Sequence, residues 1–414
     1  MTRPPYWTPL RRVAMRFAVS LFILTFLPFP FVLIPWLGDR IVELTDKLWS
    51  YLVYPVGEHV FHQKIVHDGP TGSGDTTFDW VFVACTIFFS LIITLAWSAL
   101  SRRKEYDRLY GLLRVGARYF LATTMLGYGL SKVVVQQFPA PDAYRMVEPI
   151  GEASPMGLLW TMMGLSPAYE IFGGLAETIG AVFLLFRRTT TLGALILVGV
   201  MTNVVMLNFC YDVPVKIFSS QLLLVAFFLM LPDLRALTDF LVRGRIAHPA
   251  PLVSSWPARW PRAAYVVAKV AVIGLILYSQ AWAFDGPPAA ATPLLGAWSV
   301  DTMTLDGQDM ATKDERWLVV GVGPYGARVR LQNAPALRLG FKADNEKKTL
   351  EVTARDAPNA PETWAYEQHD AEHVTVSGLH GGKAIALQMH RVATEKSLLI
   401  TRGFHWVNEF PFNR

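Results

Sequence analysis

The residues best suited to chemistry in this chain are charged side chains that interrupt long apolar stretches. Lys132, Glu177 and Asp212 are the main examples. Charged groups are rare in hydrocarbon because each costs about 2.5–3.5 kcal/mol to insert, so they normally face a cavity or a partner. A lysine beside carboxylates in such a setting can hold or transfer a proton. These three residues are therefore the candidate catalytic groups, and we predict that Lys132 approaches Glu177 or Asp212.

Further polar residues in the same stretches would line a ligand pocket around these groups. Lys132 shares a predicted helix face with Leu121 and Met125, at spacings of three and four residues. Glu177 shares a face with Gly173 and Gly180, and small residues mark the closely packed side of a membrane helix. The predicted pocket residues are Arg118, Tyr128, Asn203, Asn208, Lys216 and Ser219. All of these positions together predict one polar pocket that opens to the outer side of the membrane.

Simpler interpretations of the same residues remain open. Lys132 and Lys216 would then extend to the outer lipid headgroups, as long basic side chains often do near helix ends. Glu177 would form a structural ion pair with Lys132 or Arg118, with no part in chemistry. The distinction depends on which groups the fold brings together.

Seven stretches of the chain approach the length of about 20 apolar residues that crosses a bilayer. The chain has 414 residues, of which 52% are hydrophobic and only 17% are charged, and this excludes a wholly water-soluble, disordered or fibrous protein. The predicted spans are 17–37, 78–100, 112–135, 167–186, 190–210, 214–232 and 263–284. Pro28, Pro30 and Pro35 should kink the first span. Residues 40–54 have the spacing of an amphipathic helix on the membrane surface.

Lysine and arginine are concentrated in alternate connections between these spans. They precede the first span, follow the second and the fourth, and lie between the sixth and the seventh. Because basic residues favour the cytoplasmic side, this pattern predicts a cytoplasmic-membrane protein with its N-terminus inside and its C-terminal domain outside. The net charge of +5 arises from these flanking residues and indicates no nucleic-acid partner.

Beyond residue 285 the sequence alternates apolar and polar residues in short segments separated by turns. About eight or nine such strands predict a closed antiparallel β-barrel. Gly296-Ala297-Trp298 in the first strand, with Arg402 near the end, resembles the pairing of a Gly-x-Trp motif and an arginine in lipocalin-like barrels. We favour a lumen packed with side chains over one that holds an apolar ligand. The aromatic tail, 402–414, would pack on the barrel or insert into the helices.

The predicted architecture is thus a membrane all-α bundle joined to a β-barrel. Residues 1–110 hold the first two spans, 111–284 hold the remaining bundle, and 285–414 form the outer domain. Three motifs in the bundle are distinctive: the run from Arg118 to Lys132, Glu177 in Ala-Glu-Thr-Ile-Gly, and Tyr-Asp-Val-Pro-Val-Lys at 211–216. Over about 110–235 the chain resembles the DoxX family of small four-helix membrane proteins.

The resemblance carries functional expectations with it. The family is named for a subunit of a thiosulfate:quinone oxidoreductase, so the resemblance implies a bundle that accepts a quinone-like or lipid-like molecule and works with a membrane redox partner. A direct role in disulfide formation is disfavoured, because Cys85 and Cys210 form no Cys-x-x-Cys motif. The alternatives are a non-enzymatic component that binds membrane lipids or a partner protein, and a transporter or carboxylase-like enzyme.

Two weaker features complete the set of candidates. His59, His62 and His67 are close in sequence and include the ligand type that zinc prefers, but their spacing matches no fixed metal-site pattern, so we predict no metal. Cys85 and Cys210 both fall in the outer halves of predicted spans, and a disulfide between them is the less favoured alternative to two free thiols.

Overall fold

The computed structural model describes residues 7–65, 71–246, 262–281, 292–323, 326–354, 360–403 and 405–407. By their contacts, the residues of the chain separate into two compact units. The first is helical and combines 1–137 with 168–285, and the second combines 138–167 with 286–414. The segment 138–167, which lies between two predicted spans, therefore belongs by its contacts to the same unit as the C-terminal domain.

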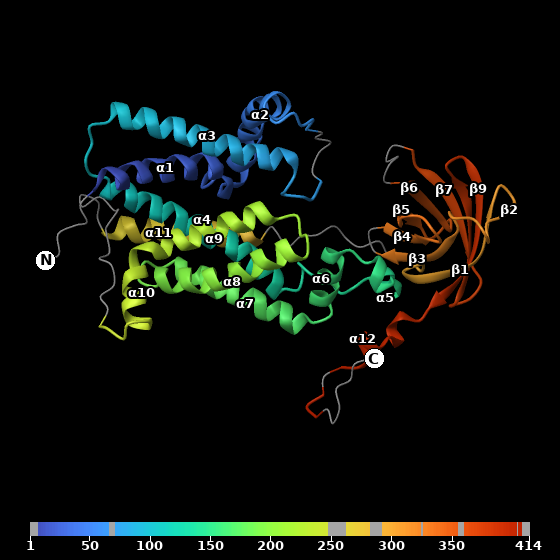
Figure 1. Cartoon of the computed structure of the whole chain (residues 1–414). Coiled ribbons are helices and arrows are strands. Elements are labelled where there is room, and N and C mark those ends of the chain that lie inside the picture. The colour runs from blue at the N-terminus through green and yellow to red at the C-terminus, as the bar shows by residue number, and fades with distance from the viewer. Residues whose placement is uncertain are drawn as a thin grey trace. The chain divides into compact units, whose positions relative to one another are not determined.

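The helices of the first unit lie close to the predicted spans, and most run lengthwise beside one another (Figure 1). Their bounds are α1 (Pro9–Phe26), η1 (Phe31–Leu33), α2 (Pro35–His59), α3 (Thr77–Leu100), α4 (Asp107–Val133), α7 (Pro167–Leu184), α8 (Thr190–Cys210), α9 (Lys216–Met230), η3 (Leu231–Asp233), α10 (Leu234–Leu241) and α11 (Arg262–Ala281). Among the described residues, four segments are long and apolar enough to cross a membrane, namely Pro9–Leu33, α3, α8 and Lys216–Leu241. The other predicted spans coincide with α4, α7 and α11, and α4 and α7 carry most of the candidate charges.

The prolines do more than kink the first predicted span, because α1 ends before them and a new helix, α2, begins at Pro35. Thr8 caps α1 by accepting a hydrogen bond from the Arg11 N–H, and the helix ends at Phe26 before the Pro28–Pro30 segment. The chain then turns into α2, which contains the predicted amphipathic helix 40–54 and extends it at both ends. One face of α2, with Trp49 and Val53, packs on α3, and the predicted apolar stripe that includes Leu44 and Leu48 is exposed.

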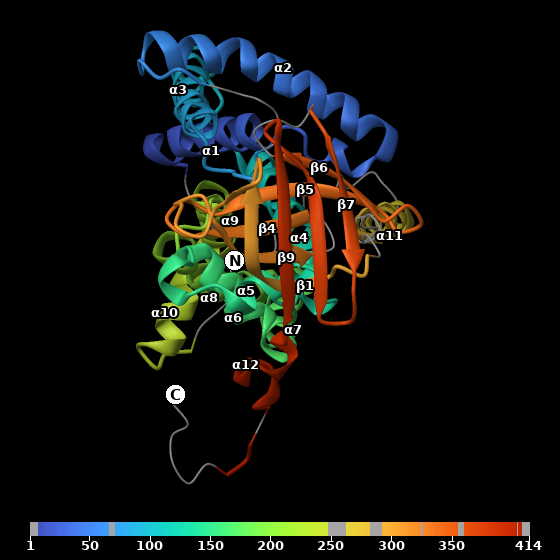
Figure 2. The same ribbon diagram turned by 90° about the vertical axis from the view of Figure 1, so that its right-hand side faces the viewer.

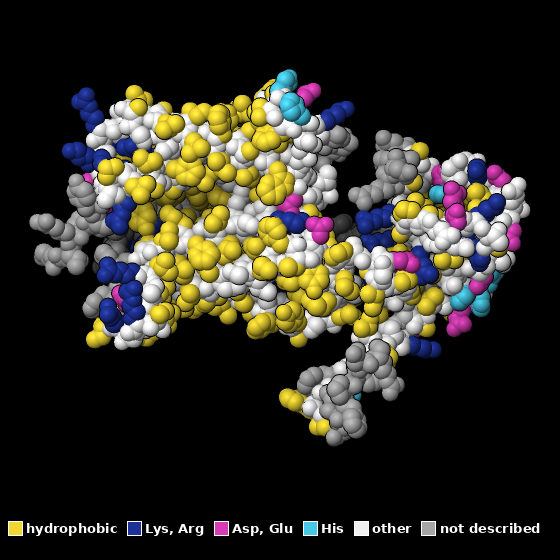
Figure 3. All heavy atoms as spheres, viewed as in Figure 1, with side chains coloured by type: hydrophobic (Ala, Val, Ile, Leu, Met, Phe, Trp, Pro, Cys, Tyr) yellow, Lys and Arg dark blue, Asp and Glu magenta, His cyan; other side chains and the backbone are white. Residues whose placement is uncertain are grey.

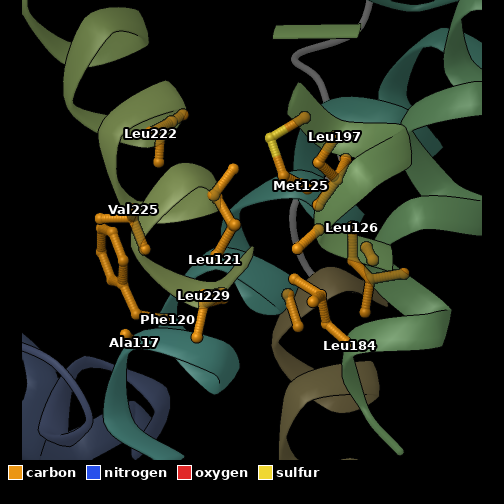
Figure 4. Close-up of a cluster of buried hydrophobic side chains, with 14 of the residues drawn as sticks. Ala117, Phe120, Leu121, Met125, Leu126, Leu184, Leu197, Leu222, Val225 and Leu229 are labelled. Atoms are coloured by element: carbon orange, nitrogen blue, oxygen red, sulfur yellow. The ribbon is translucent and has the colours of Figure 1, made fainter. Parts of the chain in front are cut away.

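A large apolar cluster lies at the centre of the bundle (Figure 4). Its labelled side chains come from α4, α7, α8 and α9, and Ile276 of α11 also belongs to it. The members labelled there are Ala117, Phe120, Leu121, Met125 and Leu126 of α4, Leu184 of α7, Leu197 of α8, and Leu222, Val225 and Leu229 of α9. This cluster fixes the rotation of α4, and with it the direction of the polar residues farther along that helix.

The second unit contains a closed antiparallel barrel (Figure 2). Its strands are β1 (Gly296–Leu305), β2 (Gln308–Asp309), β3 (Trp317–Gly323), β4 (Gly326–Leu331), β5 (Leu337–Asp344), β6 (Thr349–Ala354), β7 (Glu362–Gln368), β8 (His373–His380) and β9 (Lys383–Val392). Each strand from β3 to β9 pairs with the next, β1 pairs with both β3 and β9, and the two-residue β2 extends β1 as a hairpin. Eight strands therefore close the barrel, as the sequence predicts.

The lumen of the barrel is packed with apolar side chains, which agrees with the favoured interpretation. Trp298, Trp317 and Trp364 are each at most 3% exposed, and together with branched aliphatic residues they leave a cavity of about 50 Å³. A void of that size holds water molecules at most, not a lipid or quinone. The barrel interior is therefore a core.

The prediction that Arg402 lies in the last strand and completes the lipocalin-like pairing was wrong. Arg402 follows the short helix α12 (Leu398–Thr401), which comes after η5 (Thr394–Lys396) and outside the barrel strands. Arg391 of β9 instead stands opposite Trp298 of β1, although its own side chain is exposed at the end of the strand. Apart from 402–403 and 405–407, the aromatic tail lies outside the described residues.

The segment 138–167 contributes three short helices to the second unit: α5 (Ala143–Val147), η2 (Ile150–Glu152) and α6 (Pro155–Gly164). α6 matches the outer helix expected near 155–163, and Ser154 caps it by accepting a hydrogen bond from the Gly157 N–H. α5 packs on β3, where a Cβ on Gly321 would lie 2.2 Å from the Cβ of Tyr144. Glycine at position 321 therefore makes this close contact feasible.

Candidate functional site

The most deeply buried charges that the sequence predicted to meet are Lys132 on α4 and Glu177 on α7. The Lys132 Nζ donates to both carboxylate oxygens of Glu177, at 2.8 Å to Oε1 and 2.7 Å to Oε2. The two side chains are only 9% and 3% exposed. The prediction that Lys132 approaches Glu177 is confirmed, and a headgroup-facing Lys132 is excluded for this structure.

Glycines bring the two helices close enough for this pair to form. A Cβ on Gly174 of α7 would lie 2.6 Å from the Gly129 carbonyl oxygen of α4 and 2.7 Å from the Lys132 Cβ. The helices therefore cross at Gly129 and Gly174, one turn from the charged pair. Gly173, which the sequence had placed on this face, has open space around its Cβ position, so the choice of glycine was off by one residue.

The buried face of α7 explains why Glu177 points inward. A continuous stripe of this helix is buried and has the spacing of one helix face. Its members are Glu170, Gly174, Glu177, Ala181 and Leu184. Glu170 is completely buried and is a residue that sequence reasoning missed, although its spacing of seven from Glu177 would have indicated it.

On α4, most of the predicted polar face is buried. Arg118, Leu121, Met125 and Lys132 are all at most 8% exposed, whereas Tyr128 is 38% exposed. The Lys132 Nζ lies 5.8 Å from the centroid of the Tyr128 ring, which places Tyr128 beside the pair at the border between the bundle and its surroundings. Tyr128 therefore remains a candidate for ligand contact.

Arg118 belongs to a different level of the bundle. It precedes Lys132 by 14 residues, which is about 21 Å of helix rise. Its guanidinium lies over the Tyr119 ring at 5.0 Å. The predicted grouping of Arg118 with the outer pocket was therefore wrong, because a shared helix face does not imply a shared depth.

The remaining predicted residues form a second group at the start of α9. The Asn208 side-chain amide donates to Ser219 Oγ at 3.0 Å, and the Lys216 Nζ lies 2.8 Å from an Asp212 oxygen and 3.7 Å from Asp75. Asp212 is 82% exposed. The expected single pocket is therefore two separate groups, with Asp212 paired to Lys216 in the second.

Asp75 organises this second group, and sequence reasoning missed it. Its carboxylate accepts the backbone N–H of Lys216 at 2.8 Å and of Ile217 at 2.9 Å, so it caps α9 from a loop 141 residues earlier in the chain. The Gly74 N–H also donates to the Pro214 carbonyl at 2.8 Å. These contacts act as a structural clamp between the loop and α9, and no local signal in the sequence predicts them.

Asn203 and the weaker candidates lie elsewhere. Asn203 is exposed on α8, because the buried stripe of that helix runs through Leu197, Met201 and Asn208 instead. Cys85 is buried and Cys210 is exposed, both as free thiols, so no disulfide joins them. Within the described ranges, no group of three histidine, cysteine or acidic side chains is placed to hold a metal, and His67 falls outside those ranges.

Comparisons with known proteins give one relative. No family model matches the chain, and no solved structure matches it. The uncharacterized protein YwoB of Bacillus subtilis (strain 168) is 38% identical over 120 residues, which are 28% of this chain and 75% of the relative. At that identity and coverage, this chain belongs to the same family as YwoB.

Proposed function

We propose that this protein binds a quinone-like molecule beside the Lys132–Glu177 pair and exchanges a proton with it through that pair. The observation that carries the proposal is the bidentate contact of two nearly inaccessible charges at the crossing of α4 and α7. Ionisable groups inside a membrane bundle are costly, and they commonly mark a ligand or proton pathway.

The surroundings of the pair suit such a ligand. Quinone reduction takes up protons, and the Lys132 ammonium held against a carboxylate can donate one. The pair then carries one negative charge until a proton from water restores the ammonium. Tyr128 offers a half-exposed hydroxyl-bearing ring beside the pair. Phe172 and Leu175, on the outer face of α7, are 68% and 44% exposed and offer an apolar surface for an isoprenoid tail. The resemblance to the DoxX family supports the same ligand class and a membrane redox partner as the electron source.

The test is to purify the full chain from membranes and quantify co-purified quinone by mass spectrometry of the extracted lipids. The wild-type protein should carry quinone at a level that Glu177→Gln reduces strongly. Asp212→Asn is the matched control, because it makes the same carboxylate-to-amide change in the exposed pair with Lys216. Absence of quinone from the wild type, or equal loss in both variants, contradicts the proposal.

The proposed setting is the cytoplasmic membrane, with the N-terminus inside and the barrel outside. Its support is the distribution of basic residues: dark-blue atoms gather at one end of the helical unit, and yellow side chains cover its flanks (Figure 3). Cysteine introduced at Asn345, between β5 and β6, should react with an impermeant reagent in intact cells when Cys85 and Cys210 are both changed to alanine. Reaction only after lysis contradicts this orientation.

A non-enzymatic role is the second candidate, and one observation favours it. Lys132 donates to both carboxylate oxygens of Glu177, as it would in a purely structural ion pair. In that case the protein binds membrane lipids or a partner, and the barrel acts through its outer surface because its lumen is packed. Quinone-free wild-type protein whose fold is lost in Glu177→Gln would favour this role.

A further inference from the structure

A separate cluster of arginines surrounds Tyr106, at the junction of α3 and α4. The Arg16 guanidinium of α1 donates to the Tyr106 hydroxyl from Nε at 3.0 Å and from NH2 at 2.9 Å. Arg16 is 5% exposed and Tyr106 is 1% exposed. The guanidinium of Arg103 lies 5.8 Å from the centroid of the same ring. Two cations therefore lie beside one buried tyrosine, Arg16 at its hydroxyl and Arg103 at its ring.

The cluster has acidic neighbours, but they do not pair with its arginines. Asp107 accepts a hydrogen bond from the Trp7 indole at 2.8 Å, and Arg103 donates to the backbone carbonyl of Glu105 at 2.9 Å. None of the ion pairs among the described residues includes Arg12, Arg16 or Arg103. A neutral hydroxyl is the main partner of the Arg16 charge, and a buried charge without a counter-ion is strongly unfavourable.

Arg12 adds to this imbalance. It lies one turn before Arg16 on α1, and like charges at that spacing repel each other. Its Nε is buried and has no hydrogen-bond partner among the described residues. The hydroxyl of Ser98, one turn before Ser101, is likewise buried and unpartnered in that part of the chain. Arg12 Nε is thus a donor within the helix that carries Arg16, and no described residue accepts from it.

The ionisation of Tyr106 reflects the same excess of positive charge. Burial raises the pKa of its phenol, but hydrogen bonds with Ser101 and Arg16 and the charges of Arg16 and Arg103 outweigh that effect, and the pKa lies below its ordinary value. An environment that favours a phenolate also favours any other anion that reaches it.

We propose that Arg12, Arg16, Arg103 and Tyr106 form a binding site for a phosphate anion, supplied by the headgroup of an anionic phospholipid. A phosphate oxygen matches the planar donor array of a guanidinium. The site lies where α1 begins and α3 ends, which is the depth of the lipid headgroups when these helices cross a bilayer. Basic pockets between membrane helices commonly take such headgroups. The indole rings of Trp7 and Trp97, at 5.8 Å and 6.0 Å from the Tyr106 ring, suit the same interface.

The test measures lipid binding to the full chain in detergent by native mass spectrometry and by thermal unfolding. Phosphatidylglycerol should give a resolved bound lipid and raise the melting temperature more than phosphatidylcholine does. Arg12→Gln and Arg103→Gln should each weaken phosphatidylglycerol binding about fivefold, which corresponds to about 1 kcal/mol per arginine. Arg103 is exposed, so its variant keeps the test valid even where changes at buried Arg16 unfold the protein.

Neighbouring arginines supply matched controls. Arg11→Gln and Arg102→Gln remove the same charge from exposed positions beside Arg12 and Arg103. These controls should change binding by less than about twofold, since surface charges contribute little. Stabilisation by inorganic phosphate as well as by phosphatidylglycerol supports a phosphate site whose ligand is the free anion. Equal binding of both lipids without a phosphate effect, or equal losses in the controls, overturns the proposal.

Discussion

Both units of this protein bury apolar side chains, but they differ in the charged groups that they bury. The described residues of the helical unit bury six charged groups: Arg16, Arg118, Lys132, Glu170, Glu177 and Asp233. The described part of the barrel unit buries no charged group, and Thr292 is its one buried polar side chain. Among the described residues, buried ionisable groups thus lie in the helices, whereas the interior of the barrel is packed with apolar side chains.

The difference follows from how each unit satisfies its backbone. A closed barrel pairs all of its strands, so its lumen can be filled with side chains such as Trp298 and Leu387 chosen for volume alone. A membrane bundle gains little from apolar contact between helices, because lipid is equally apolar, and it depends on close crossings and polar contacts instead. The close crossing here is that of Gly129 with Gly174, and the polar contact is that of Lys132 with Glu177.

The strongest test of this comparison removes one member of the buried pair. Lys132→Met or Glu177→Gln should each destabilise the protein by about 3–5 kcal/mol, because the remaining partner loses its buried counterpart. The double variant should lose less than the sum of the two. Chemical unfolding of all three variants in detergent measures the coupling energy. Purely additive losses would show that the pair is not a unit.

A barrel-core change should instead act through volume. Leu387 is 1% exposed and lines the small cavity in the barrel. The substitution Leu387→Ala should lower the free energy of unfolding by about 2–5 kcal/mol. Leu379→Ala, on an exposed side chain of β8, is the control and should stay within about 0.5 kcal/mol. The loss is measured by thermal unfolding of the full chain. A comparable loss in the control would mean that the barrel is not held by its interior.

The clamp at α9 should have a smaller effect. Asp75→Ala removes the acceptor of two backbone N–H groups and should cost about 0.5–2 kcal/mol, as the loss of a helix cap does. Asp212→Asn breaks an exposed ion pair and should cost no more than about 1 kcal/mol. Unfolding measurements on both variants show which substitution lowers stability more. A larger loss in Asp212→Asn than in Asp75→Ala would mean that Asp212, not Asp75, stabilises the start of α9.

The smallest expected effect lies on the barrel surface, at His373 and Asp370. A hydrogen bond to Asp370 raises the pKa of His373, and the same bond lowers the pKa of Asp370. The histidine contribution to stability is therefore present below its ordinary pKa and fades as the pH rises through the raised value. The carboxylate contribution is present above the ordinary aspartate pKa and is lost as the pH falls through the lowered one.

Titration of the His373 ring by NMR checks this assignment. In the Asp370→Asn variant the pKa of His373 should move down toward its ordinary value, since the accepting carboxylate is gone. Glu395→Gln, a change at an exposed acid outside the barrel strands, should leave the titration unchanged. An unshifted His373 in the Asp370 variant would assign the raised pKa to other charges.

Patterns within one segment of the chain were enough to predict the helices and strands. The apolar run 190–210 coincides with α8, and the alternation beyond residue 285 correctly predicts a barrel. The pairing of Lys132 with Glu177 also follows from the sequence, since two lone charges on small-residue faces have few other partners. Contacts between distant segments carried no such signal. Asp75 bonds to α9 across 141 residues of sequence. The spacing that placed Arg118 on the same helix face as Lys132 gives no information about its depth along the helix.

The connection between α4 and α7 has a practical consequence for dissecting this protein. Segment 138–167 joins the helices that carry Lys132 and Glu177, yet it packs with the barrel through Tyr144 on Gly321 and through the Arg330–Glu152 ion pair. A truncation after residue 285 would strip this linker of its packing partner and expose Tyr144, which is now 2% accessible. The barrel is thus not a detachable module, and loss of activity on deleting it would not locate the active site there.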